Sequence, residues 1–69
     1  MDTTYTKDIN EVIKAFESKK SVQVITADGD AFKVRQVLSN GAQLRISQRG
    51  RESVIEVDPK MQFRYADPL

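Results

Sequence analysis

Four turn signals punctuate the later two-thirds of this chain, about one every ten residues. They are Asp28-Gly29, Asn40-Gly41, Arg49-Gly50 and Asp58-Pro59. The runs between them are rich in Val, Ile, Leu, Phe and Tyr, and they alternate apolar with polar residues. Short alternating runs at this spacing are typical of consecutive antiparallel strands in a small barrel or sandwich. The pattern predicts five strands within residues 21–65.

The alternation also predicts which side chains face the core. A three-residue loop at 27–29 makes Val24 face Phe32, and one at 39–41 makes Leu38 face Ala42. Each loop has Gly in third place, where a type I turn plus bulge needs a left-handed residue. A two-residue turn at Arg49-Gly50 pairs Leu44 with Ile55. The predicted inward residues are Val22, Val24, Phe32, Val34, Leu38, Ala42, Leu44, Ile46, Ile55, Val57, Met61, Phe63 and Tyr65.

Residues 8–20 predict one amphipathic helix. Ile9, Val12, Ile13 and Phe16 have the spacing of a single helical face, and Asp8 offers an N-cap. An apolar stripe needs a surface to cover, so we expect the helix to close an open end or face of the barrel. Residues 1–7 are expected to form a flexible arm and residues 66–69 a fraying tail. The whole chain, 1–69, is then a single domain.

The composition excludes several kinds of chemistry. The chain has no Cys and no His, so it lacks thiolates, disulfides, the usual metal ligand and the usual general base near neutral pH. We therefore expect no enzyme, no cofactor and no metal. No apolar run approaches the roughly 18 residues of a membrane span, and the first residues do not resemble a secretion signal. These features predict a cytoplasmic protein without membrane contact.

The best candidate binding surface is the outward face of the predicted strands. Basic side chains gather there with glutamines between them, and two further arginines occupy the adjoining hairpin. Arg and Lys neutralise phosphates, and Gln hydrogen-bonds bases or backbone. Such residues also keep any exposed strand soluble, and the net charge of +1 alone implies no polyanion partner. The candidate residues, for binding either nucleic acid or an acidic protein partner, are Lys33, Arg35, Gln43, Arg45, Arg49, Arg51, Gln62 and Arg64.

One helix followed by five short strands resembles the Sm-like fold, which includes the Hfq family and the small Rof-type proteins that inhibit the transcription terminator Rho. The alternation of residues 22–29, followed by Phe32, is similar to the first Sm strand pair. The resemblance implies a mainly β (α+β) chain with an N-terminal helix and a five-stranded antiparallel small barrel. SH3-like and Tudor-like barrels have the same strand count. The Gly usual in the second Sm strand is absent near Arg35, and residues 57–60 lack the Tyr-Lys-His type motif of Hfq, so no RNA-binding residue is carried over.

These observations favour a non-enzymatic regulatory module that contacts RNA or DNA, or a nucleic-acid-handling protein, through its basic face. A second hypothesis is an inhibitor or adaptor, of the kind that phages and mobile elements encode, that binds a larger protein partner. A third is a structural subunit that forms homo-oligomers through its sheet edges. One feature counts against single-strand binding: Phe32, Phe63 and Tyr65 are predicted to point inward, which leaves Tyr5 as the only aromatic free for stacking.

Overall fold

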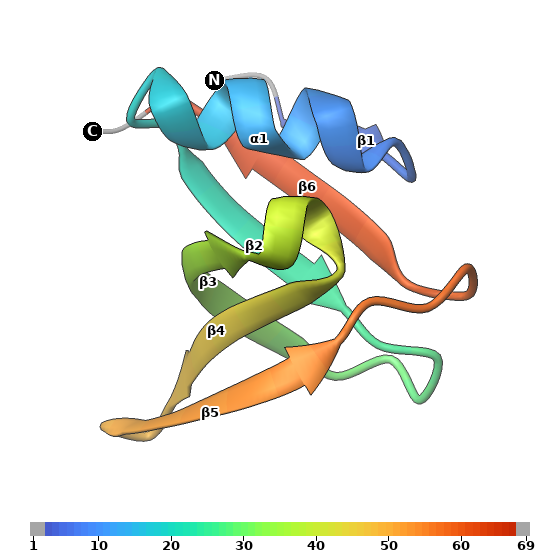
Figure 1. Cartoon of the computed structure of the whole chain (residues 1–69), viewed down its shortest axis with the longest axis vertical. Coiled ribbons are helices and arrows are strands. Elements are labelled where there is room, and N and C mark those ends of the chain that lie inside the picture. Colours follow the sequence, from blue (N-terminus) through green and yellow to red (C-terminus); the bar gives the residue numbers. More distant parts are fainter. Residues whose placement is uncertain (1–2, 68–69) are drawn as a thin grey trace.

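A computed structural model describes residues 3–67 of the chain. They form one helix, α1 (Ile9–Glu17), a 3-10 turn, η1 (Ser39–Gly41), and six strands. The mainly β class with a helix near the N-terminus is confirmed (Figure 1). The strands are β1 (Thr4–Thr6), β2 (Ser21–Ile25), β3 (Ala31–Leu38), β4 (Gln43–Gln48), β5 (Arg51–Glu56) and β6 (Gln62–Ala66).

All six strands belong to one antiparallel sheet, in the order β1-β6-β2-β3-β4-β5. Strands β2 to β5 follow one another as hairpins, and β6 then returns to pair with the other side of β2. The sheet is bent but not closed, and β1 and β5 are its edges within residues 3–67 (Figure 1). Five strands were expected, and the sixth, β1, lies in the segment predicted to be an arm. Ala66, predicted to be in the tail, ends β6; residues 1, 2, 68 and 69 lie outside the described part.

The core lies between the inner face of the bent sheet and α1. Its largest fully buried side chains are Phe63, Leu44, Val12, Val22 and Val24. Three of the four residues of the predicted helical stripe are confirmed, since Val12 is buried and Ile9 and Phe16 pack against the same cluster. Figure 1 shows α1 lying across one end of the sheet, where it contacts β1, β2, β6 and η1. The helix therefore covers the core with its apolar face, as predicted from the sequence.

The ends of α1 follow from local hydrogen bonding. Asp8 is the N-cap, and its carboxylate accepts a hydrogen bond from the Asn10 backbone N–H at 2.9 Å. At the other end, Lys19 adopts a left-handed φ of 60°. The N–H groups of Lys19 and Lys20 then bond back to the carbonyls of Phe16 and Ala15, which is the Schellman arrangement. This motif ends the helix at Glu17 rather than at the predicted residue 20.

Two of the predicted hairpins are confirmed in register. Val24 pairs with Phe32 across the 27–29 loop. Leu44 pairs with Ile55, and the connecting Arg49-Gly50 turn has positive φ at both residues. Two consecutive left-handed residues match the twist of a two-residue hairpin. Turn chemistry and face alternation therefore agree at both ends of the meander.

The remaining hairpin, between β3 and β4, differs from the prediction because β3 contains a bulge. Val34 pairs with Ile46, but the next pair is Gln36 with Arg45, so Arg35 is an extra residue. Beyond the bulge the alternation is reversed, and Val37, not Leu38, packs against the core. Leu38 pairs with Gln43 instead of Ala42, and Ala42 is exposed. The predicted inward positions of Leu38 and Ala42 are therefore wrong.

The loop after β3 packs closely beneath α1. Ser39, Asn40 and Gly41 all have positive φ, and Gly41 is buried. A Cβ atom on Gly41 would lie 2.7 Å from Cγ1 of Ile9. Only a residue without a side chain fits this left-handed position against the helix. Gly41 thus brings η1 under the N-terminal turn of α1.

Candidate functional site

The face of the sheet opposite the core carries most of the predicted site, and we call it the outer face. Side chains alternate between the two faces along each strand, so residues that neighbour buried ones point outward. Lys33 and Arg64 flank the buried Val34 and Phe63, and Arg45 lies between the buried Leu44 and Ile46. By the same alternation Gln43 and Gln62 are also on the outer face.

The strand registers align six outer-face residues side by side, one from each strand. Each is the direct partner of the next across the sheet. At the usual strand spacing of about 4.8 Å, the first four members span about 14 Å. We call this set the outer row; in order it is Tyr5, Arg64, Gln23, Lys33, Ser47 and Glu52. The row brings together residues that are far apart in the sequence.

A second group lies beside the outer row, at the bulge of β3. Arg35 and Gln36 together oppose Arg45, because a bulge sets two residues against one. On the other side of Arg45, its partner in β5 is Val54, which is 52% exposed. Arg35, next to Gln36, and Arg45 thus lie on neighbouring strands at the bulge, and like charges on neighbouring strands are unfavourable.

The basic residues of the outer face have no acidic partner in the described part of the chain. The one ion pair within residues 3–67 joins Lys20 and Asp67 at 3.7 Å. Lys33, Arg35, Arg45 and Arg64 therefore have no carboxylate within 4.0 Å among these residues. The outer face also carries two acidic residues, Glu52 and Glu56, on the edge strand β5, where they pair with Ser47 and Gln43. An anion bound across β6, β2, β3 and β4 would relieve this unbalanced positive charge.

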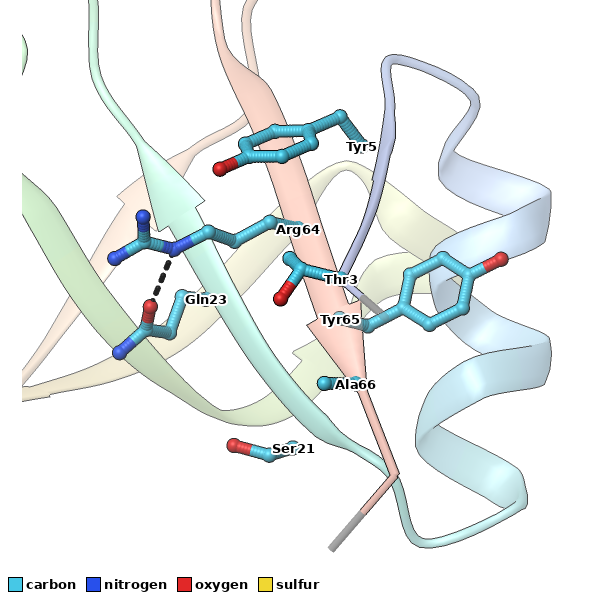
Figure 2. A pocket seen from close by; sticks show the side chains of 7 residues that line it. All are labelled: Thr3, Tyr5, Ser21, Gln23, Arg64, Tyr65 and Ala66. Atoms are coloured by element: carbon cyan, nitrogen blue, oxygen red, sulfur yellow. Dashed lines mark hydrogen bonds between the residues drawn. The ribbon is translucent and has the colours of Figure 1, made fainter. Parts of the chain in front are cut away.

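Arg64 is held in place by Gln23. Its Nε donates a hydrogen bond to Oε1 of Gln23 at 2.5 Å, and both side chains are half-buried. Figure 2 shows the guanidinium group and the Gln23 amide on one side of the sheet, with the Tyr5 ring above them, while Tyr65 points to the other side. A pocket of about 230 Å³ opens here, lined by Thr3, Tyr5, Ser21, Gln23, Arg64, Tyr65 and Ala66.

The two arginines of the last hairpin are separated from this surface. Arg51 alternates with Glu52, so it shares the side of Ser53 and Ile55 rather than the outer face. Arg49 occupies the turn itself. Together with Gln48 and Ser53 they line a hollow of about 540 Å³ at the hairpin. The eight candidate residues thus form an outer-face group of six and a hairpin pair.

Strand β1, which carries Tyr5, pairs with β6, and β6 is hydrogen-bonded to α1 on the opposite side of the sheet from Tyr5. The Tyr65 hydroxyl donates to the Glu11 carboxylate at 2.6 Å. Hydrogen bonds from the hydroxyls of Thr6 and Tyr65 lower the pKa of Glu11 below its usual 4.5. The bond to Glu11 raises the pKa of Tyr65 above 10.0. The Tyr65–Glu11 bond thus joins β6 to α1, and Nζ of Lys20 lies 5.3 Å from the Tyr65 ring centre.

The structure adds three residues to the predicted site: Tyr5, Gln23 and Gln36. The alternation of residues 22–25 predicts that Gln23 points outward, on the same face as Arg64. Tyr5 was recognised as a free aromatic, but a three-residue strand is too short to give a periodic signal. Gln36 was missed because its orientation depends on the bulge at Arg35.

Three further observations bear on what the chain does. None of the helices within residues 3–67 is long and apolar enough to cross a membrane. The same residues contain no group of three or more carboxylates placed to hold a metal ion. Comparison of the chain with protein-family models, with curated proteins and with solved structures found no match.

Proposed function

We propose that this chain is a non-enzymatic binding module that contacts nucleic acid through the outer face of its sheet. The observation that carries the proposal is the group Lys33, Arg35, Arg45 and Arg64, four cations on one face without ion-pair partners among residues 3–67. Phosphates bound to such a face release their counterions, which supplies the main driving force for binding. The glutamines beside these cations supply hydrogen bonds to the backbone or the bases.

The resemblance to Sm-like barrels is part of this proposal. The order of one helix followed by a meander of short strands, β2 to β6, supports it. The additional strand β1 and the open edges at β1 and β5 are features that the resemblance does not include. The function is therefore argued from the surface and not from the fold.

The test is fluorescence anisotropy with labelled single-stranded RNA and duplex DNA, titrated with the wild type and two double variants. Arg35→Gln/Arg45→Gln removes two charges from the outer face. Lys14→Gln/Lys19→Gln removes two charges from exposed positions on and after α1, so it is matched in net charge. We expect the first pair to weaken binding at least tenfold more than the second. Equal weakening by both pairs would show that only net charge matters.

Salt dependence tests the same proposal independently. If four phosphates are neutralised, a single-stranded ligand should lose roughly 50-fold in affinity between 50 and 200 mM salt. Absence of binding at low salt would contradict the proposal. In that case the chain does not use the outer face for nucleic acid.

One observation favours a second candidate, a protein adaptor or inhibitor. Val54 is one of two large hydrophobic residues that are exposed within residues 3–67, and it lies next to Arg45 on the free edge strand β5. Exposed apolar side chains beside Arg are typical of protein interfaces. This candidate predicts binding that persists at moderate salt and is lost in Val54→Glu. Nucleic-acid binding, in contrast, should be weakened by less than tenfold in that variant.

A further inference from the structure

We infer that the pocket beside Tyr5 is a stacking site for one base of a single-stranded nucleic acid. This inference rests on the proposed function and names the form of nucleic acid that the outer face prefers. Proteins that bind single strands combine cations that follow the backbone with aromatic rings on which bases stack. The outer row has this composition at one end, where Tyr5, Arg64, Gln23 and Lys33 are consecutive cross-strand neighbours.

Tyr5 is placed as a stacking platform. Its side chain is 54% exposed, although aromatic residues in a chain this small are normally used to fill the core. The three other aromatic residues of the sheet, Phe32, Phe63 and Tyr65, pack in or against the core. Tyr5 does not contribute to that core, and its ring lies over the pocket in Figure 2. Its exposure is therefore explained by a ligand rather than by packing.

Arg64 is oriented to hold the phosphate next to such a base. Gln23 accepts a hydrogen bond from Nε of Arg64. The two terminal nitrogens of the Arg64 guanidinium make no hydrogen bond to residues 3–67. These two nitrogens can donate in parallel to phosphate oxygens. Because Gln23 already fixes the guanidinium, less side-chain entropy is lost when the ligand binds. Lys33, on the far side of Gln23, is the next cation along the row.

The size and rim of the pocket fit one flat group. Its volume, about 230 Å³, lies below the roughly 300–1,000 Å³ of pockets that enclose whole small molecules. The hydroxyl groups of Thr3 and Ser21 and the Gln23 amide are polar groups at its rim (Figure 2). A base in a duplex is covered on both faces by its neighbours, so it does not reach Tyr5. The site therefore selects single strands over duplexes.

The experiment compares two labelled single strands of equal length and phosphate number, one carrying bases and one abasic throughout. Equal charge makes their electrostatic attraction to the outer face equal, so a difference in Kd measures contacts to the bases. The protein is the full chain, as wild type, Tyr5→Ala and Tyr5→Phe. Tyr5→Phe keeps the ring and removes only the hydroxyl. Circular dichroism of each variant checks that the sheet is retained.

We expect the wild type to bind the base-carrying strand about five- to 150-fold more tightly than the abasic strand, the range of a single stacked base. Tyr5→Ala should remove this difference, and Tyr5→Phe should keep it. Equal binding of both strands by the wild type overturns the stacking site while the nucleic-acid function stands, because salt-sensitive binding remains. The same conclusion follows if Tyr5→Ala is folded and keeps the difference. If the wild type binds neither strand nor duplex DNA at low salt, both proposals are overturned.

Discussion

The Tyr65 hydroxyl donates a hydrogen bond to the Glu11 carboxylate, with 2.6 Å between the two oxygens, and so joins β6 to α1. The hydroxyl of Thr6, on β1, also lowers the pKa of this carboxylate. The Tyr65–Glu11 hydrogen bond therefore fastens α1 to β6, the strand with which β1 pairs. Tyr5 and Arg64 are the sequence neighbours of Thr6 and Tyr65 and point to the opposite face. The Tyr65–Glu11 hydrogen bond and the candidate pocket thus lie on opposite sides of the same pair of strands.

The first prediction concerns the pH dependence of stability. Hydrogen bonds from Thr6 and Tyr65 lower the pKa of Glu11 in the folded chain, so the folded state favours the ionised carboxylate. Their stabilisation is present above the ordinary pKa of Glu and is lost as the pH falls through the lowered value. We expect Glu11→Gln to reduce the fall in melting temperature between about pH 6 and pH 3, followed by circular dichroism. Glu17→Gln, also on α1, should leave the wild-type profile unchanged, and an identical profile in Glu11→Gln would contradict the prediction.

The second prediction concerns the contact between η1 and α1. Gly41→Ala combines a left-handed φ of 103° with a Cβ atom 2.7 Å from Ile9. Gly29→Ala is the matched control, since φ there is 89° but nothing lies within 4 Å of the added Cβ atom. Backbone strain alone should cost each variant about 1–2 kcal/mol of unfolding free energy. Chemical denaturation should show an additional loss for Gly41→Ala, and equal losses would mean that Ile9 moves aside at no cost.

The third prediction tests the bulge in β3. Val37 packs against the core and Leu38 pairs with Gln43 outside it. A Gln side chain at position 37 would bring its amide against the core without a hydrogen-bond partner among residues 3–67. Burying an unpaired amide costs about 1–3 kcal/mol. We therefore expect Val37→Gln to lower the unfolding free energy by at least about 1 kcal/mol more than Leu38→Gln. The reverse order, measured by urea denaturation, would support an unbulged strand.

The fourth prediction separates core packing from surface contact. Leu44 is fully buried, whereas its near neighbour across the β4–β5 pair, Val54, is 52% exposed. Leu44→Ala should destabilise the chain by about 2–5 kcal/mol. Val54→Ala should change its stability by less than about 0.5 kcal/mol. A large loss in Val54→Ala would show that this residue serves the fold and not a partner.

The sequence predicts those parts of the fold where turn chemistry and alternation agree. The Arg49-Gly50 turn sets the Leu44–Ile55 pair, and the 27–29 loop sets the Val24–Phe32 pair, because short loops allow few registers. The bulge at Arg35 was not predictable in this way, since Arg is not a residue that marks a bulge. The left-handed φ of Gly41 was predicted from the Asn40-Gly41 turn signal, but the left-handed φ of Ser39 was not marked in the sequence. The basic outer face was predictable from alternation alone, but its junction with Tyr5 required the pairing of β1 with β6.

The outer row links ligand binding to the stability of the fold. Its first four residues are numbers 5, 64, 23 and 33, and they become neighbours only when β1, β6, β2 and β3 are paired. A ligand that needs them together binds the native state and not the unfolded chain. At a concentration 100 times its Kd it would add about 2.7 kcal/mol to the stability of the fold. For a chain of this size that corresponds to an increase in melting temperature of about 10 °C or more, so thermal-shift screening of oligonucleotides tests the proposed binding without a label.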